Sequence, residues 1–557
     1  MIFPLLFAAS SILAQVSALK PAFGTNGMVS SSDSLATSIG VRILKEGGNA
    51  VDAAVAVGFA LAVTYPQAGN LGGGGYYLIH LRNGDDFAID ARETAPAAAT
   101  PSMFLDSLGN PVPGKSLVGG LSAGVPGNVD GLILAEEKFG RLSLAKVIAP
   151  AITLADSGFA VNKKLQTNFD SALSLLKTFP STMKYFTKNG STYREGEIIT
   201  QKDLARVLRM ISFEGRDGFY RGEIPRLIAQ QDQTTGGIMT ADDIEHYRAV
   251  IKEPIAASYH GYRILSMSPS SSGGICLAEM LNILEHFDLR TYGFGASQSL
   301  HYEIEAMRHA YADRDRYLGD VAFATVPVEK LTSKEYAGAI AARIDTFSAT
   351  PSSEIYPDMM IPAGEGPHTT HYSVIDKERN AVSVTTTLNS WFGSMVVVDG
   401  AGFFLNNEMD DFSLKPGVPN QFGAIGTDAN AIQPGKRMLS SMSPTIVMKD
   451  GKPFLILGSP GGTTIINSVL EVMLNIIDFN MPLVDAELAG RIHHQWIPDE
   501  VVYEKSALVY DVQQNLLTRG YKLVPANYLG EVQTILVTPT GFEGVADPRG
   551  AGTAEGY

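Results

Sequence analysis

The stretch TTHYSVIDKERNAVSVTTTLN, residues 369–389, decides the fold. It has two runs of β-forming residues, 370–375 and 381–389, with turn residues between them, and this pattern predicts a β-hairpin. If the hairpin loop has three residues, Thr369 lies opposite Thr387 and the two hydroxyls share one face. A one-residue slip would turn Thr387 to the other face.

Thr369 follows a segment that predicts an exposed loop. Residues 352–368, SSEIYPDMMIPAGEGPH, contain three prolines and two glycines, which suit neither a helix nor a strand. A hydroxyl is a weak nucleophile at neutral pH and needs a base beside it. A free N-terminal threonine supplies that base, because its α-amino group has a pKa near ~8 in peptides. The pattern fits an autoprocessed nucleophile, and it also fits an ordinary threonine pair after a linker.

Helices are expected on both sides of this region. Residues 29–64 predict a helix with N-caps from Ser30 to Ser32 and an interruption at Gly47 and Gly48, and residues 118–350 are mostly helical in pattern. Further strands are predicted at 76–81, 403–406, 444–449 and 452–457, and a further helix at 463–479. Strands in the last third, with helices before and after, predict a layered protein of helices and sheets.

Two short polar segments suggest binding groups of opposite charge. Glu408, Asp410 and Asp411 place three carboxylates within four residues, which suits an ammonium group. A metal is disfavoured because histidine ligands are absent nearby and the spacing is not that of a calcium loop, and on these residues alone a solvated acidic turn is the favoured alternative. Ser440 and Ser441 offer hydroxyl donors for a carboxylate, or simple turn chemistry.

Two further features can stabilise negative charge. Residues 458–462, GSPGG, lie between a predicted strand and helix, where backbone N–H groups can hold an oxyanion or only form a tight turn. Arg92 follows a predicted strand and can bind a carboxylate through a bidentate contact, or form a surface ion pair. The adjacent His493 and His494 are poorly placed as a zinc pair and are interpreted as structural. The sequence indicates no cofactor.

Composition limits the class of protein. The chain has 557 residues, 45% hydrophobic and 18% charged, as in ordinary globular proteins. A formal net charge of −15 argues against nucleic acid and anionic membranes as main partners. The single cysteine excludes an internal disulfide and metal sites built on several cysteines.

The first 18 residues resemble a secretory signal. An apolar run ends in small residues at 16–18, although no Lys or Arg precedes Lys20, and an uncleaved anchor or a misassigned start codon are the alternatives. No later segment offers about 20 uninterrupted apolar residues, so no membrane span is expected in the mature chain. The expected location is secreted or periplasmic.

Over nearly its whole mature length the chain resembles bacterial γ-glutamyltransferases. Each matching motif is weak alone, but nine of them in the family's order are specific. They are GGNAVDAAVA (47–56), GNLGGGG (69–75), DARETAP (90–96), PSSSGG (269–274), YADRDRYLGD (311–320), TTHYSVIDK (369–377), LNNEMDDFS (405–413), LSSMSPT (439–445) and GSPGG (458–462).

The resemblance implies an α+β fold, the four-layer αββα sandwich of the N-terminal nucleophile hydrolases. It also implies self-cleavage between His368 and Thr369. The expected products are a large subunit, residues 19–368, and a small subunit, residues 369–557, which stay together as one compact catalytic unit after a signal peptide, residues 1–18.

The resemblance also implies a role for each candidate residue. Thr369 is similar to the family nucleophile, with its freed amine as base, and Thr387 to the threonine that hydrogen-bonds it. Gly461 and Gly462 match the oxyanion hole. The α-carboxylate of the substrate would be bound by Arg92, Ser440 and Ser441, and its α-ammonium by Asn389, Glu408 and Asp411.

The implied reaction cleaves the γ-glutamyl amide of glutathione and related compounds through an ester on Thr369. Water, amino acids or peptides then take the acyl group, and the balance between hydrolysis and transfer is open. Residues 416–437 resemble a lid loop, in which Phe422 replaces a common tyrosine and predicts a looser lid. The alternatives are a glutaryl β-lactam acylase, a poly-γ-glutamate depolymerase and, outside the enzymes, an inactive secreted binding protein.

Overall fold

A computed structural model describes residues 19–356 and 369–557 of the protein. The expected signal at 1–18 and His368 of the expected cleavage site lie outside these residues. Within the two described ranges, no helix combines the length and apolar character that crossing a bilayer requires.

Two seven-stranded sheets form the centre of the molecule, and all neighbouring strands in them are antiparallel. The first, called the β10 sheet, has the order β19 (Thr553–Gly556), β2 (Gly27–Ser31), β10 (Thr370–Asp376), β11 (Ala381–Thr387), β3 (Gly74–His80), β4 (Asp86–Ala91) and β7 (Val250–Lys252). The second, called the β13 sheet, has the order β1 (Ala22–Gly24), β18 (Gly541–Ala546), β17 (Gln533–Thr538), β13 (Lys452–Leu457), β12 (Thr445–Lys449), β9 (Tyr262–Ser266) and β8 (Ile255–Tyr259).

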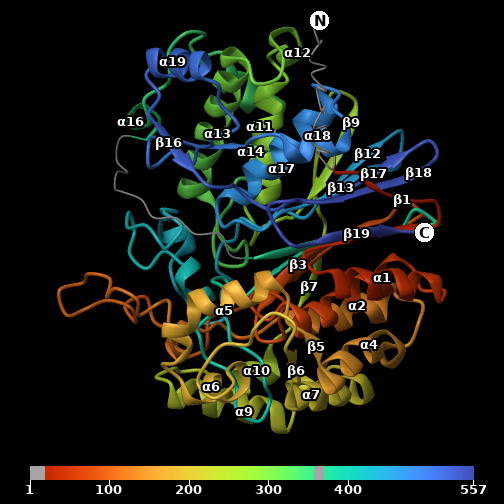
Figure 1. Cartoon of the computed structure of the whole chain (residues 1–557). Helices are drawn as coiled ribbons and strands as arrows, with labels where there is room; N and C mark the ends of the chain where they lie inside the picture. Colours follow the sequence, from red (N-terminus) through yellow and green to blue (C-terminus); the bar gives the residue numbers. More distant parts are fainter. Residues whose placement is uncertain (1–18, 357–368) are drawn as a thin grey trace, which may run out of the picture.

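Helices cover the outer face of each sheet, as Figure 1 shows. The β10 sheet is covered by α1 (Ser34–Lys45), α2 (Ala50–Thr64) and α3 (Asn128–Phe139), with α4 (Leu144–Ser157) packed outside α2 and α7 (Lys202–Glu214) packed on α4. The β13 sheet is covered by α11 (Gly273–Leu284), α13 (Ser297–Tyr317) and α17 (Thr464–Ile477). All 15 residues of α2 are buried, because α2 lies between the sheet and other helices. The predicted four-layer αββα sandwich of the α+β class is confirmed.

The remaining elements are short helices and strands around these layers. They are α5 (Lys163–Leu176), α6 (Pro180–Phe186), α8 (Asp217–Tyr220), α9 (Glu223–Thr234), α10 (Ala241–His246), α12 (Leu289–Tyr292), α14 (Val328–Leu331), α15 (Lys334–Ala341), α16 (Ser352–Ile355), α18 (Leu483–Leu488), α19 (Tyr510–Thr518), β5 (Phe159–Ala160), β6 (Ile198–Ile199), β14 (Ile492–His493), β15 (Val501–Glu504), β16 (Leu523–Ala526) and the 3₁₀ helices η1 (Gly120–Ser122), η2 (Glu408–Asp411) and η3 (Asp428–Asn430).

Both apolar and polar contacts join the two sheets. Met28 and Leu78 of the β10 sheet share one buried cluster with Ile456 of the β13 sheet. Nearby, the Ser383 hydroxyl donates to the Leu457 carbonyl oxygen at 3.0 Å. This hydrogen bond satisfies a buried hydroxyl and links the two sheets.

Strands from before and after Thr369 are interleaved. In the β10 sheet, β10 and β11 lie between β2 and β3. In the β13 sheet, β12 pairs with β9 and β18 pairs with β1. The two parts of the chain therefore share both sheets rather than forming separate domains.

Three local predictions were wrong. Residues 352–355 of the expected exposed loop form the short helix α16, in which Ser352 is buried. The N-cap of α1 is Asp33, whose carboxylate accepts from the N–H groups of Leu35 and Ala36 at 3.1 Å, because residues up to Ser31 are already paired in β2. Residues 403–406 form no continuous strand, since Phe404 and Leu405 make only isolated bridges to two different segments.

Candidate active site

The β10–β11 hairpin sets the position of Thr369. Thr370 pairs with Thr386 and Ile375 with Ala381, so the loop has three residues and the predicted register is confirmed. The Asp376 carboxylate closes this loop by accepting from the N–H groups of residues 378 and 380 at 2.8 and 3.0 Å. The register places Thr369 opposite Thr387.

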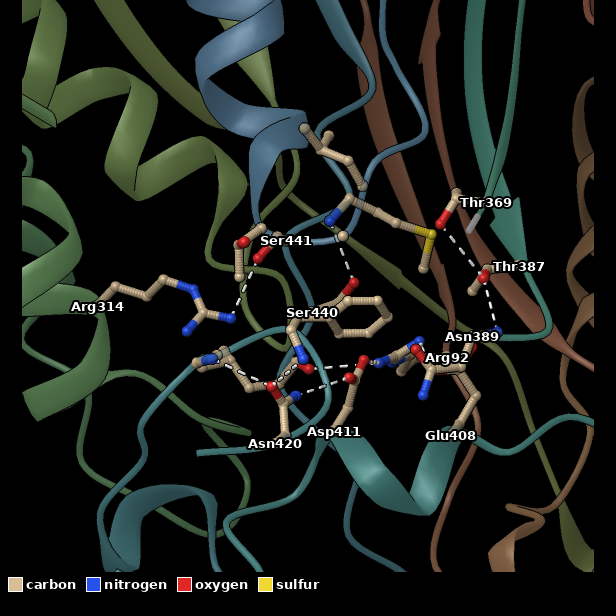
Figure 2. Close-up of a pocket in the computed structure, with 17 residues that line it drawn as sticks. Arg92, Arg314, Thr369, Thr387, Asn389, Glu408, Asp411, Asn420, Ser440 and Ser441 are labelled. Carbon is tan, nitrogen blue, oxygen red and sulfur yellow. Dashed lines mark hydrogen bonds and ion pairs between the residues drawn. The ribbon is translucent and has the colours of Figure 1, made fainter. Parts of the chain in front are cut away.

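The two hydroxyls meet as this register requires. Thr369 Oγ1 donates to Thr387 Oγ1 at 3.4 Å, and the Asn389 N–H donates to the same Thr387 oxygen at 2.8 Å (Figure 2). Thr369 is buried, with 6% of its surface exposed. The backbone after β11 therefore orients Thr387 toward Thr369.

Thr369 lies at the wall of a cavity that gathers most of the candidate residues. The cavity volume is about 30 Å³, which holds a water molecule but no amino acid. Of the candidates, those that line it are Thr369, Thr387, Asn389, Arg92, Glu408, Asp411, Ser440, Ser441 and Gly462, while Gly461 directly precedes Gly462.

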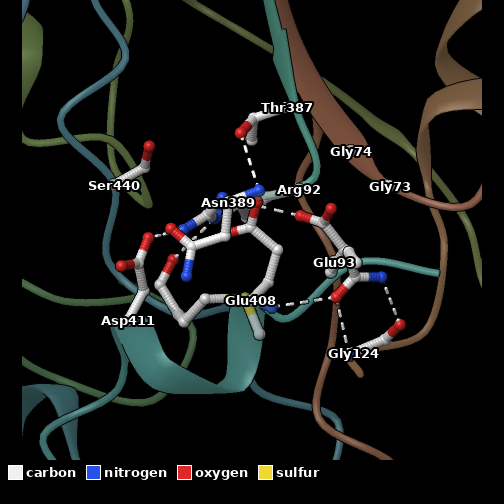
Figure 3. A network of polar contacts seen from close by, with 12 residues as sticks. Gly73, Gly74, Arg92, Glu93, Gly124, Thr387, Asn389, Glu408, Asp411 and Ser440 are labelled. Atoms are coloured by element: carbon white, nitrogen blue, oxygen red, sulfur yellow. Dashed lines mark hydrogen bonds and ion pairs between the residues drawn. The ribbon is translucent and has the colours of Figure 1, made fainter. Parts of the chain in front are cut away.

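The charged residues of this cavity contact one another. Arg92 follows β4 and is 1% exposed. Its guanidinium pairs with Glu408 at 2.5 Å, with Asp411, and with Glu93 at 3.6 Å (Figures 2 and 3). The interpretation of Arg92 as a surface ion pair is therefore wrong. The buried guanidinium has carboxylate partners because an unpaired buried charge is strongly destabilising.

Burial shifts the protonation of these carboxyl groups. It raises the pKa of Glu93 to about 8, although Arg92 opposes the shift. It also raises the pKa of Glu408 well above the ordinary value, again against the effect of Arg92, and raises the pKa of Asp411. For Arg92, burial lowers the pKa, but Glu408 and Asp411 outweigh it and the net shift is upward. Burial therefore favours the protonated form of these carboxyl groups, while Arg92 favours the charged form.

The serine pair on the opposite wall is fixed by a residue that the sequence analysis did not select. Arg314 on α13 donates to Ser441 Oγ at 3.1 Å and to Ser272 Oγ at 3.1 Å, and it pairs with Asp315 at 2.8 Å. The Ser440 carbonyl oxygen accepts from the Ser272 N–H at 2.8 Å. Arg314 lies within the stretch YADRDRYLGD, which matches the family but does not show which residues the arginine contacts.

The glycine turn of residues 458–462 connects β13 to α17, as predicted. Gly462 has φ +58°, and a Cβ there would lie 2.8 Å from the Phe422 ring, so the turn needs glycine at this position. The Tyr311 hydroxyl donates to the carbonyl oxygen of Thr463, the next residue. Backbone N–H groups at such a helix start can stabilise developing negative charge.

A loop covers this cavity. Asn420, Phe422 and Ala424 line it, and Phe422 is only 7% exposed. Asn420 Nδ2 donates to Asp411 Oδ1 at 3.3 Å, which ties the loop to the charged cluster. We call residues 416–437 the cover loop. The looser lid expected from Phe422 stays a prediction.

A family model described as "Gamma-glutamyltranspeptidase" matches residues 36–557. This chain belongs to the γ-glutamyltranspeptidase family. Its sequence is 50% identical to "Glutathione hydrolase proenzyme" of Escherichia coli (strain K12), over 95% of this chain and 91% of the relative. It is 36% identical to "Acylase ACY 1 proenzyme" of Pseudomonas sp. (strain SE83), over 96% and 94%.

Solved structures agree with the family. The cephalosporin acylase from Bacillus halodurans matches with a TM-score of 0.85 at 28% identity, covering 99% of both chains. The γ-glutamyltranspeptidase of Helicobacter pylori matches with a TM-score of 0.58 at 47% identity, covering 58% of this chain and 93% of that one. The chain is therefore an enzyme of this family with the N-terminal nucleophile hydrolase fold, and the relatives named above are described as proenzymes.

Proposed function

We propose that this chain cuts itself between His368 and Thr369 and then transfers γ-glutamyl groups from glutathione and related donors. The observation that carries the proposal is one buried cavity with a hydroxyl pair, Thr369 and Thr387, at 3.4 Å and a charged cluster around Arg92. A nucleophile beside groups of both charges suits an amide whose acid part is an amino acid.

The cut would leave two subunits, residues 19–368 and 369–557, preceded by a signal at 1–18 that directs the chain out of the cytoplasm. Interleaving supports their staying together, because β10 and β11 of the small subunit are paired on both sides with β2 and β3 of the large one. Separation would break strand pairs in both sheets.

Cleavage supplies the base that the nucleophile needs. In the continuous chain the nitrogen of Thr369 is a peptide nitrogen and cannot accept a proton usefully. Attack of the Thr369 hydroxyl on the preceding carbonyl carbon breaks the C–N bond and forms an ester, and the hydroxyl proton passes to the freed nitrogen. Water then hydrolyses the ester. The freed α-amine then has a pKa suited to general-base catalysis near neutral pH.

The charged cluster can bind a glutamyl head by exchanging partners. A zwitterionic head carries one carboxylate and one ammonium. We assign the carboxylate to Arg92, with Ser440 and Ser441, and the ammonium to Glu408 and Asp411, with Asn389. Each buried charge then keeps an opposite partner while the Arg92 pairs open. The cavity must also enlarge, since about 30 Å³ holds no glutamyl group.

The transfer step takes place at the hydroxyl pair of Thr369 and Thr387. The freed amine takes the hydroxyl proton as Thr369 Oγ1 attacks the γ-carbonyl carbon, and the N–H groups of Gly461 and Gly462 hold the oxyanion. The leaving amine takes the proton as the C–N bond breaks, and a γ-glutamyl ester remains. Water or the amine of an amino acid or peptide then displaces Thr369, while Thr387 keeps the nucleophile oriented by its hydrogen bond.

An intact-mass spectrum of the purified parent and a Thr369→Ala variant tests the proposal. We expect two fragments that meet at residues 368 and 369 in the parent, and one chain in the variant. Thr370→Ala is the matched control, because the Thr370 hydroxyl bonds Ser32 instead, at 3.0 Å, and its chain should still be cut. A single uncut chain in the parent would refute the proposal.

The acylase relatives make a glutaryl substrate the competing choice. Glutaryl groups lack the α-ammonium, so Glu408 and Asp411 together favour a γ-glutamyl donor. We expect a γ-glutamyl anilide to react at least about 100-fold faster than the glutaryl anilide, because the latter leaves buried carboxylates without an ammonium partner. Equal rates would favour the acylase. A poly-γ-glutamate depolymerase shares the linkage, and a polymer assay tests it separately.

A further inference from the structure

Gln495 joins the glycine turn to the cover loop. It follows β14 and is 9% exposed. Its Oε1 accepts from Thr463 Oγ1 at 2.6 Å, and Thr463 is the residue directly after Gly462. Its Nε2 donates to the Phe422 carbonyl oxygen at 3.3 Å and to the Ile497 carbonyl oxygen at 3.4 Å. One side-chain amide therefore contacts both segments.

The orientation of this amide is fixed by its neighbours. Asn467 Nδ2 donates to the His494 carbonyl oxygen at 3.2 Å and to His493 Nδ1 at 2.7 Å, so Nδ1 of His493 is the acceptor. The proton of His493 then sits on Nε2, which lies 2.8 Å from Gln495 Oε1 and donates to it. Gln495 Oε1 thus faces two donors, and its NH₂ group is directed to Phe422.

The histidine keeps this arrangement over a wide pH range. Burial lowers the pKa of His493 to about 4, so the ring is neutral and Nδ1 remains an acceptor near neutral pH. His493, for which the sequence predicts only a structural role, therefore orients Gln495 toward the active site.

The turn and the cover loop also touch directly. The Phe422 ring lies against Gly462, where it would meet a Cβ at 2.8 Å. Gln495 therefore donates to the backbone carbonyl oxygen of Phe422 in the loop and accepts from Thr463 beside the turn. These two hydrogen bonds flank the Phe422–Gly462 contact. The amide links the position of the loop to the position of the turn.

We propose that Gln495 is a positioning residue for the reaction, which holds the oxyanion turn in place while it holds the cover loop shut. The inference rests on the proposed function, since it assumes that Gly461 and Gly462 bind the oxyanion. Closing the loop then completes both hydrogen bonds of the Gln495 side chain and fixes the turn. Opening the loop breaks the hydrogen bond to Phe422.

Three variants of the processed enzyme test this role. Gln495→Met keeps the size of the side chain and removes the amide, and Thr463→Val removes only the bond to the turn. Gln533→Met is the matched control, because Gln533 is also buried but its side chain accepts from Ser30 between the sheets, at 3.1 Å. The measurements are amide hydrogen exchange of residues 418–427 and the kcat and KM for a γ-glutamyl anilide.

We expect Gln495→Met to speed exchange in the cover loop about fivefold, as for one lost hydrogen bond, and to lower kcat about tenfold with a smaller change in KM. Thr463→Val should lower kcat about threefold. Gln533→Met should leave loop exchange at the parent rate. Unchanged loop exchange in Gln495→Met, or an equal increase in Gln533→Met, would overturn the inference.

A double-mutant cycle separates coupling from a general structural effect. Phe422→Ala removes the ring that holds the loop on Gly462, so adding Gln495→Met should lower kcat by less than it does in the parent. Strictly additive effects would overturn the inference. A parent that is uncut or inactive on γ-glutamyl anilide would instead count against the proposed function.

Discussion

The cavity has a neutral end and a charged end, and they are built differently. Thr369 and Thr387 at the neutral end are placed by backbone pairing in a hairpin whose register leaves one arrangement. Arg92, Glu408 and Asp411 at the charged end are placed by side chains that neutralise one another. The neutral end can keep its geometry through the reaction, whereas the charged end must change partners to admit a charged substrate.

The largest expected effect comes from removing the cation of the charged end. Arg92→Met leaves Glu408 and Asp411 buried without their partner, which should lower the free energy of unfolding by about 3–5 kcal/mol. It also removes the main contact for the substrate carboxylate, so kcat/KM should fall at least about 1,000-fold. Denaturant unfolding and initial rates measure the two effects.

Arg308→Met distinguishes loss of stability from loss of binding. Arg308 is equally buried, 1% exposed, and pairs with Glu305 and Asp499, but it does not line the cavity. Its loss should destabilise the protein to a similar extent and leave the KM of the folded fraction unchanged. If Arg92→Met were no worse than Arg308→Met in KM, the charged end would not bind the carboxylate.

A substitution at the neutral end should lower the reaction rate rather than weaken substrate binding. Thr387→Val keeps the shape of the side chain but removes the hydrogen bond to Thr369, so we expect kcat to fall about 100-fold with KM nearly unchanged. Thr386→Val is the control, because the Thr386 hydroxyl points to the opposite face and bonds the Gly74 carbonyl oxygen at 2.8 Å. A large rise in KM for Thr387→Val would show that the neutral end also binds the substrate, which contradicts this division of roles.

The charged end should also make stability depend on pH. The pKa of Glu93 is raised by burial to about 8, against a reference of 4.5, so the folded state holds a proton that the unfolded state has lost. The free energy of unfolding should therefore fall as pH rises from 4.5 toward 8, by at most about 1.4 kcal/mol per pH unit for one proton.

Glu93→Gln removes that titration and should flatten the slope between pH 5.5 and 8, as measured by urea unfolding. Thr387→Val changes a group that does not titrate in this range and should keep the parent slope. An unchanged slope in Glu93→Gln would mean that the retained proton resides elsewhere in the cluster, on Glu408 or Asp411.

The two ends also differ in how far the sequence predicts them. Turn residues between two β-forming runs give the hairpin loop, and side-chain alternation then places Thr369 beside Thr387 without knowledge of the rest of the fold. At the charged end, the sequence indicates which residues carry charge. It does not show that Arg92 contacts Glu408, because more than 300 residues separate them and burial determines the pairing.

The errors elsewhere have a similar origin. Ser30 and Ser31 can cap a helix, but pairing of β2 with β10 and β19 takes them into a strand. Residues 403–406 have the composition of a strand, but their neighbours in space lie on two different segments. Arg314 gave no local sign of its contact with Ser441, since a buried arginine on a helix is recognised only from the packing around that helix.

The smallest expected effect is at Phe422, where the cover loop meets both ends. Its ring lies against Gly462 of the neutral end, while Asn420 reaches Asp411 of the charged end. Phe422→Tyr adds a hydroxyl next to a cavity lined by Asn389 and Ser440, and one such hydrogen bond is worth about 0.5–1.5 kcal/mol. We expect donor KM to fall about twofold to fivefold and the ratio of hydrolysis to transfer to change, because a better-held loop admits water and acceptor differently. An unchanged KM together with an unchanged ratio would show that the hydroxyl adds nothing to a loop already held by the Phe422 carbonyl group and Asn420.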